Sequence, residues 1–391
     1  MSDAIVIVGA KRTPIGAMLG KFTSVAAPQL GAAAIKAALE QAGVKPDEVE
    51  DLIFGCVLPA GQGQAPARQA ALGAGLDKST PSTTVNKMCG SGMKAAMMAA
   101  DEIIAGGATI VVAGGMESMT NAPHLLPKVR GGYRYGHQRV LDHMAFDGLE
   151  NAYDGKPMGF FADKTAEKYG ITRAQMDSFA RVSTERAVSA SKSGAFADEI
   201  TPVTVAGRKG DEVVTDDETP FTVNVDKIAT LRPAFNKDGL VTAATSSSIS
   251  DGAAALVMMT ESLAKKRGVK PLARIVAYAS NAHEPEWFTT APVGAIRKVL
   301  DKAGWKAADV DLWEVNEAFA VVTMAAMKDV GIAHDKVNVN GGACALGHPI
   351  GATGARIITT LIYALKKRGL KKGVAALCIG GGEATAIALE V

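Results

Sequence analysis

The residue best placed to do chemistry is a cysteine in a glycine-rich turn. Cys89 lies in residues 86–92 (NKMCGSG), between a short strand-like run and an apolar helix expected over residues 93–104. A helix N-terminus favours negative charge, so we expect the pKa of the Cys89 thiol to fall below the free value of about 8.5. The flanking glycines would let a ligand approach the backbone N–H groups. The motif alone leaves open whether Cys89 is reactive or a buried structural cysteine.

Two further glycine-rich motifs carry a histidine and a second cysteine. His348 lies in residues 340–351 (NGGACALGHPIG), ahead of a helix expected over residues 352–367. This rigid frame suits a general base, and the alternative is a turn histidine satisfied by the backbone. Cys378 ends a buried strand and precedes a glycine tract that includes Gly380 (LCIGGGE). Backbone N–H groups of such a tract suit an oxyanion hole, although glycine tracts are also common in plain turns.

A polar pair follows the strand expected over residues 310–315. Asn316 and Glu317 open the motif NEAFA, at the carboxyl end of a strand, where α/β sheets place their ligands. The alternative is structural, with Asn316 capping the next helix and Glu317 in its first turn. The motif alone does not exclude that alternative.

These motifs need elements to position them, and the chain contains an internal repeat. Residues 34–52 (AIKAALEQAGVKPDEVEDL) and 295–312 (AIRKVLDKAGWKAADVDL) each predict an amphipathic helix ending in Ala-Gly, a short acidic turn and an apolar strand. Residues 108–117 and 373–383 are also alike, since each predicts a buried strand followed by glycines. We therefore predict a duplicated α/β domain whose halves are related by a pseudo-dyad.

The chain between the two halves has a different character. It opens with Asn, Pro, Gly, Tyr and Arg, continues with helices expected over residues 164–170 and 173–193, and ends in a polar tail. We expect this insertion to cover one face of the core and to supply ligand and subunit contacts. The predicted units are an N-terminal half (residues 1–118 plus 250–268), an inserted loop domain (119–249) and a C-terminal half (269–391).

Bulk properties argue against several classes of protein. The 391 residues carry a formal net charge of +2, so no global field selects a nucleic acid or a membrane surface. No apolar run reaches the roughly 20 residues of a membrane span, and the strand-like residues 4–8 do not resemble a signal peptide, so we expect a cytoplasmic protein.

The histidines and cysteines form no zinc-like cluster, and no disulfide framework is expected. Cys56 and Cys344 lie in apolar settings, and we expect both thiols to be inert.

Taken together, the motifs resemble those of the thiolase family, and more closely its acetyl-CoA acetyltransferase branch. The likeness runs from GAKRTPIG near the start to the final strand, so it covers essentially the whole chain. Each motif alone is weakly to moderately specific, whereas their combination in this order is highly specific. The matching stretches are NKMCGSGMKAA, MES (residues 116–118), RPAF (232–235), SDGAAA (250–255), NEAFA, NGGACALGHPIGATGAR and CIGGGEA.

The resemblance implies a fold, an assembly and a reaction. The fold is a duplicated five-layer αβαβα core with an inserted loop domain, and the assembly is a homotetramer built as a dimer of dimers. The reaction is a ping-pong condensation of two acetyl-CoA to acetoacetyl-CoA and CoA, or the reverse thiolytic cleavage, through an acyl-cysteine. The resemblance implies coenzyme A thioesters as substrates, with no metal and no permanently bound cofactor.

The resemblance also implies roles for individual residues. Cys89 would form the acyl-enzyme after His348 takes its proton, and Cys378 would move the α-proton of the second acyl-CoA. Asn316 would hold a water that forms one oxyanion site with His348, while the N–H groups of Cys89 and Gly380 form the other. The wall around the pantetheine and adenine would comprise Ser247, Ala243, Phe235, Met158, Phe319 and Leu149.

Three alternatives remain open. A β-ketoacyl synthase shares the duplicated fold and the cysteine nucleophile, but such enzymes typically have histidine where this chain has Cys378. The second is a 3-ketoacyl-CoA thiolase that accepts a broader range of acyl chain lengths and works in fatty-acid β-oxidation. The bulky residues Trp287 and Phe288 beside the expected acyl pocket argue for short acyl chains instead. The third is a non-catalytic CoA-binding protein on the same fold, and the presence of all four catalytic residue types argues against it.

Overall fold

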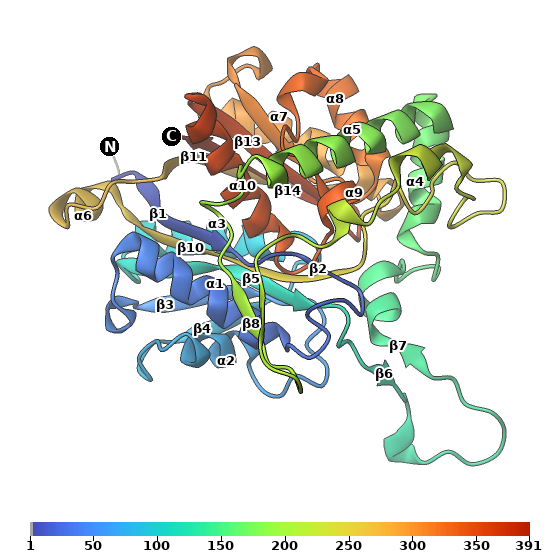
Figure 1. Ribbon diagram of the computed structural model, residues 1–391, viewed down its shortest axis with the longest axis horizontal. Helices are drawn as coiled ribbons and strands as arrows, with labels where there is room; N and C mark the ends of the chain where they lie inside the picture. The colour runs from blue at the N-terminus through green and yellow to red at the C-terminus, as the bar shows by residue number, and fades with distance from the viewer. Residues whose placement is uncertain (1–2) are drawn as a thin grey trace.

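The computed structural model describes residues 3–391, and its sheet consists of two similar halves (Figure 1). In spatial order, the strands of the first half are β4 (Ser82–Val85), β3 (Asp51–Gly55), β5 (Ile110–Ser118), β10 (Ser250–Thr260) and β1 (Ile5–Arg12). β3 is parallel to both of its neighbours, whereas β10 is antiparallel to β5 and β1. β10 therefore completes the first half-sheet, although the whole insertion precedes it in the sequence.

The second half-sheet repeats this plan. Its strands, in spatial order, are β12 (Leu312–Val315), β13 (Lys372–Ile379), β14 (Glu383–Glu390) and β11 (Ala273–Ala282). β12 is parallel to β13, and β14 is antiparallel to β13 and β11. At the place that β4 occupies in the first half, the second half has an isolated parallel bridge between Trp313 and Val337. The halves join edge to edge, because β1 pairs antiparallel with β11.

Helices cover the outer face of each half-sheet. α1 (Ala27–Ala42) and α2 (Pro66–Gly73) share an apolar cluster with the first half-sheet. α7 (Ala291–Ala303) and α8 (Ala320–Val330) share another with the second. Alternate residues of each strand belong to the outer apolar cluster, because successive side chains of a strand point to opposite faces of the sheet.

Two helices fill the space between the half-sheets. α3 (Ser91–Ala105) and α10 (Thr353–Arg368) share one core with strands of both halves. Residues 353–365 of α10 are all buried, which is the pattern of a helix enclosed on every side. With the outer helices, this gives the predicted five-layer αβαβα order.

Two glycines let the central helices touch at their N-terminal ends. A Cβ atom at Gly354 would lie 2.2 Å from the backbone nitrogen of Met93, and one at Gly92 would lie 2.9 Å from that of Ala355. Any larger residue would push the helices apart. The starts of α3 and α10 therefore meet, and each directly follows one of the predicted catalytic loops.

The predicted repeat is present as two matching segments. α1, a 3-10 turn and β3 form one segment, and α7, a 3-10 turn and β12 form the other. Both helices end at a glycine in the left-handed conformation, Gly43 with φ 61° and Gly304 with φ 66°. This C-cap strongly favours glycine, so the Ala-Gly pairs correctly marked both helix ends.

The insertion forms a projecting hairpin and two helices. β6 (His124–Leu125) and β7 (Leu141–Asp142) pair at the base of the hairpin, which extends away from the core in Figure 1. α5 (Arg173–Lys192) matches its prediction and is capped by Thr172. α4 (Met158–Tyr169) begins well before the expected residue 164. Gly159, in the first turn of α4, weakens the helix locally. The ring of Phe235 packs where a Cβ of Gly159 would lie, and this contact stabilises the helix there.

The remaining elements are short. They are β2 (Gly16–Ala17), β8 (Val203–Val205), β9 (Glu212–Val214), α6 (Glu261–Lys266) and α9 (Ala343–Leu346), with several 3-10 turns and one π turn. Within residues 3–391, no helix combines the length and the hydropathy that crossing a membrane requires.

Candidate active site

Cys89 sits in a strained turn between β4 and α3. Met88 has a positive φ of 48°, a conformation that costs a residue with a side chain about 1–2 kcal/mol. Two side chains hold the turn in this shape. Asn86 accepts the backbone N–H of Met88 at 2.9 Å, and the Ser91 hydroxyl donates to the Met88 carbonyl at 2.6 Å. Strain held by surrounding hydrogen bonds is typical of functional turns.

The pKa expected for Cys89 is wrong in direction. Burial raises the pKa of the Cys89 thiol to about 11, and the nearby charge of Glu117 acts in the same direction. The backbone N–H groups of Gly380 and of Cys89 itself act in the opposite direction and do not compensate. Desolvation thus outweighs the helix terminus on which the expectation rested. Cys89 is a thiol at neutral pH and needs a base to become a nucleophile.

His348 has the properties of such a base. Its ring is buried, and burial followed by the charge of Arg356 lowers the pKa of His348 to about 3. The ring is therefore neutral and can accept a proton. Nδ1 lies 2.6 Å from Oγ1 of Thr353, and Nε2 has no hydrogen-bond partner within residues 3–391. The alternative of a histidine satisfied by the backbone is wrong, because neither ring nitrogen bonds to the backbone.

Glu117, at the end of β5, ties the histidine loop to the first half-sheet. Its buried carboxylate accepts the N–H groups of Val57 at 3.0 Å and Gly351 at 2.9 Å. Burial raises the pKa of Glu117 to about 7. Ile350, next to Gly351, belongs to the same apolar cluster as Cys89. The motif MES contains Glu117, but only the fold shows that Glu117 positions the histidine loop. The one feature of the sequence that could have indicated this role is an acidic residue at the end of a buried strand.

Cys378 and Gly380 approach the same centre from the second half. The Cys378 thiol is fully buried near the end of β13, and burial followed by the charge of Cys89 raises its pKa. The N–H of Gly380 faces the Cys89 sulfur closely enough to favour its thiolate. The two loops are in tight contact, since a Cβ at Gly90 would lie 2.4 Å from Cδ1 of Ile379.

An ion pair crosses this contact between the halves. Lys87, in the turn of Cys89, pairs with Glu383, which follows the glycine tract. Both side chains are partly exposed, and exposed pairs contribute at most about 1 kcal/mol. The pair therefore acts more on the alignment of the two loops than on overall stability.

Asn316 follows β12 as predicted, but it is not a helix cap. α8 begins at Ala320, and Phe319 occupies the cap position. The side-chain oxygen and nitrogen of Asn316 are both buried without a partner within residues 3–391. Buried polar groups are nearly always paired, so an ordered water is the partner expected of this amide.

Glu317 has a structural role that the sequence did not reveal. Its carboxylate accepts hydrogen bonds from the Ser183 hydroxyl at 2.7 Å, the Asn338 amide at 2.8 Å and the backbone N–H of Cys344 at 3.1 Å. Gly342 is required here, because a Cβ would lie 2.2 Å from the Glu317 carboxyl carbon. Glu317 thus anchors the loop that leads to His348.

The six residues expected to line the coenzyme A wall divide into groups. Met158 and Phe319 belong to the apolar cluster that contains Cys378, and Phe235 lies edge-on to Phe319 with ring centroids 5.8 Å apart. Ser247 bonds to the Ala318 carbonyl, and Leu149 packs in the cluster that contains Cys89. Ala243 is exposed in the turn at residues 242–245 and, within residues 3–391, belongs to neither of these apolar clusters.

Family comparison agrees with this geometry. The family model described as "Thiolase, N-terminal domain" matches residues 5–262, and "Thiolase, C-terminal domain" matches residues 269–391. The chain belongs to the thiolase family.

Individual thiolases align with the chain from end to end. The acetyl-CoA acetyltransferase of Chromobacterium violaceum is 51% identical over 99% of both chains, and that of Cupriavidus necator is 50% identical over 100% of both. A solved structure, of the acetyl-CoA acetyltransferase from Syntrophomonas wolfei, superposes with a TM-score of 0.97 at 42% identity and covers 100% of both chains. The predicted thiolase fold is thereby confirmed.

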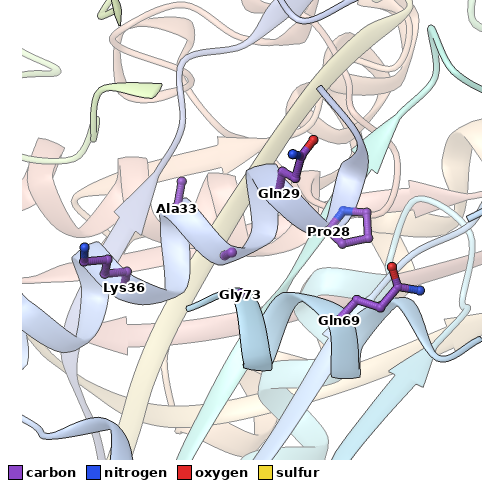
Figure 2. Close-up of a pocket in the computed structure, with 7 residues that line it drawn as sticks. Pro28, Gln29, Ala33, Lys36, Gln69 and Gly73 are labelled. Carbon is purple, nitrogen blue, oxygen red and sulfur yellow. The ribbon is translucent and has the colours of Figure 1, made fainter. Parts of the chain in front are cut away.

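The outer layer of the first half contains a surface cavity that is separate from the thiolase centre. A cavity of about 430 Å³ lies between α1 and α2 (Figure 2). α1 belongs to an outer layer, whereas Cys89 and His348 lie at the ends of the central helices, so this cavity is not part of the site. Its walls contain no cysteine, histidine or carboxylate and comprise Pro28, Gln29, Ala32, Ala33, Lys36, Gln69 and Gly73.

Proposed function

We propose that this protein is an acetyl-CoA C-acetyltransferase, which condenses two acetyl-CoA to acetoacetyl-CoA and CoA and catalyses the reverse cleavage. One observation carries the proposal: the loops of Cys89 and Cys378, from different halves, are in contact at Gly90 and Ile379, and the N–H of Gly380 faces the Cys89 sulfur. A β-ketoacyl synthase typically has histidine in place of Cys378. Relatives of about 50% identity whose names state this activity support the same conclusion.

In the first half-reaction, His348 accepts the thiol proton of Cys89 through Nε2 while the sulfur attacks the carbonyl carbon of acetyl-CoA. The thiol pKa of about 11 makes a free thiolate rare at neutral pH, so proton removal accompanies the attack. The N–H groups of Cys89 and Gly380 stabilise the oxyanion. The bond from carbon to the CoA sulfur then breaks, the CoA sulfur takes the proton from His348, and acetyl-Cys89 remains.

In the second half-reaction, the Cys378 thiol gives its proton to Nε2 of His348, and the thiolate so formed removes a proton from C2 of a second acetyl-CoA. The imidazolium of His348, which donates through Nε2–H, and a water held by Asn316 stabilise the enolate oxygen. The enolate carbon attacks the carbonyl of acetyl-Cys89, the bond from carbon to Cys89 breaks, and the Cys89 sulfur takes the proton from His348, while Cys378 keeps the proton from C2. Burial raises the pKa of Cys378, so Cys378, like Cys89, needs a base to become a thiolate.

Short acyl chains fit the proposal best. Phe288 is buried with its ring 6.4 Å from that of Phe319, and Thr289 is fully buried with its hydroxyl 2.6 Å from that of Thr165. Phe288 and Phe319 belong to the same apolar cluster as Cys378, and bulky rings beside the reacting centre favour short acyl chains. Met158, Phe235 and Phe319 provide the apolar surface proposed for the pantetheine.

The acyl-enzyme provides the direct test. Incubation with acetyl-CoA should add one acetyl group to the peptide that contains Cys89, because the N–H of Gly380 faces the Cys89 sulfur and Cys89 is the proposed nucleophile. Peptide mass spectrometry after acid quenching measures this. Label confined to the Cys378 peptide would overturn the assignment, and Cys89→Ala should remove the label.

We also propose a cytoplasmic homotetramer. The projecting hairpin carries apolar side chains that are exposed to solvent in the single chain, with Tyr135 100% and Val140 57% exposed. A cluster of this kind on an extended arm is typical of a surface that a second copy covers.

A further inference from the structure

The two ring nitrogens of His348 have different surroundings. The ring is buried and neutral, so one nitrogen carries a proton and the other a lone pair. Nδ1 lies 2.6 Å from Oγ1 of Thr353, whereas Nε2 has no partner within residues 3–391. The proposed function requires the lone pair on Nε2, and something must keep the proton on Nδ1.

The hydroxyl of Thr353 decides where that proton lies. Thr353 is fully buried in the first turn of α10, and its hydroxyl donates to the Pro349 carbonyl at 2.9 Å. A hydroxyl has one hydrogen. With that hydrogen on the Pro349 carbonyl, Oγ1 offers a lone pair to Nδ1 of His348, and Nδ1 must be the donor.

The opposite arrangement, with the ring proton on Nε2, is unfavourable both at the Thr353 hydroxyl and at Nε2. If the Thr353 hydroxyl turned toward Nδ1, Oγ1 and the Pro349 oxygen would face each other at 2.9 Å without a hydrogen between them. The ring proton would then lie on Nε2, a buried donor without an acceptor. The bond from a helix threonine to the carbonyl four residues earlier also restricts the χ1 rotamer of Thr353, which keeps Oγ1 under the ring.

We propose that Thr353 is a positioning residue that holds His348 in the Nδ1–H tautomer and leaves the Nε2 lone pair free for the proton of Cys89. The proposal rests on the proposed function, in which His348 is the base. Thr353 itself transfers no proton. When His348 becomes an imidazolium, Nδ1–H continues to donate to Oγ1, so the same contact orients the ring throughout the proton transfer.

Two substitutions separate this role from simple packing. Thr353→Val replaces the hydroxyl by a methyl group of similar size, and Thr353→Ser keeps the hydroxyl. Thr359→Val is the matched control, because Thr359 is also buried in α10 and donates to the carbonyl four residues earlier, Ala355, at 3.0 Å. Thr359 has no contact with the active site in the described hydrogen bonds.

The first measurement is the tautomer itself. In ¹⁵N magic-angle-spinning spectra of the full-length protein labelled at the histidine rings, His348 is assigned by its absence from the His348→Asn spectrum. We expect a protonated Nδ1 and a bare Nε2 in the wild type, Thr353→Ser and Thr359→Val. Thr353→Val should show loss of that pattern, with protonated Nε2 present. A protonated Nε2 in the wild type, or an unchanged tautomer in Thr353→Val, would overturn the proposal.

The second measurement is the rate of Cys89 acetylation. Thr353→Val should lower this rate about 10- to 100-fold with little change in the KM for acetyl-CoA, since general-base catalysis is impaired while binding is not. Thr353→Ser and Thr359→Val should stay within about threefold of the wild type. A full rate in Thr353→Val would contradict the role. If wild-type Cys89 is not acetylated at all, the proposed function fails, while the spectra still report the tautomer.

Discussion

The thiol of Cys89 shows how far local sequence can predict a reactive residue. The turn, the flanking glycines and the following helix are all visible in residues 86–92, and the structure has each of them. The direction of the pKa is not visible there, because it depends on burial by chain segments far away in the sequence. Gly380 and Glu117 act on the Cys89 pKa, and neither lies near Cys89 in the chain.

The partner thiol has a separate task that substitution can reveal. Cys378→Ser replaces the thiol by an alcohol, which is a much weaker acid, so removal of the α-proton should fall at least about 100-fold. Acetylation of Cys89 needs no α-proton and should be little changed. Exchange of labelled CoA into acetyl-CoA measures the first half-reaction, and formation of acetoacetyl-CoA measures the whole.

Cys344→Ala is the control for that experiment, because Cys344 is also a buried thiol whose burial raises its pKa, yet it has no proposed role. It should retain both reactions. Equal loss of exchange and condensation in Cys378→Ser would contradict the division of labour between the two cysteines.

At the scale of elements, the sequence predicts correctly those helix ends that depend on the backbone of the helix itself. It does not predict features that depend on packing against distant segments. Gly43 and Gly304 mark helix ends by their own backbone conformation. The start of α4 was missed because Gly159 weakens the helix locally and Phe235 compensates from another segment. The carboxylates of Glu117 and Glu317 were missed as anchors for the same reason, since their hydrogen-bond partners come from distant loops.

The contact between α3 and α10 can be tested at one glycine. Gly354→Ala places a methyl group 2.2 Å from the Met93 backbone nitrogen, and such overpacking costs about 1–3 kcal/mol. We expect the thermal midpoint to fall by about 1–4 °C. Acetylation of Cys89 should also slow, because the helices carry Cys89 and His348 at their ends.

Differential scanning calorimetry together with the acetylation rate measures both effects. Gly131→Ala is the control, since no atom lies within 4 Å of its added Cβ. A Gly354→Ala protein with unchanged stability and rate would show that the central helices adapt easily, contrary to the tight contact described above.

At the scale of the whole molecule, the projecting hairpin is the part that a single chain does not explain. Val129 and Tyr135 are 50% and 100% exposed on it. In the proposed tetramer a second copy covers them, so Val129→Ser combined with Tyr135→Ser should give smaller assemblies. Light scattering coupled to size-exclusion chromatography measures the mass.

Arg139→Ser, a polar change on the same exposed hairpin, should leave the tetramer intact. A wild-type protein that is not tetrameric, or a double variant that remains so, would count against the assembly. Because the active-site residues lie in the core, the double variant should still acetylate Cys89.

The position of β10 between β1 and β5 has a consequence for protein synthesis. The ribosome completes β5 at Ser118 and begins β10 at Ser250, and translation of the chain between them takes roughly ten seconds. During that time β1 and β5 lack the strand that joins them, and each presents an unpaired edge capable of pairing with another nascent chain. Molecular chaperones that shield strand edges are therefore expected to bind this polypeptide while its insertion is still being translated.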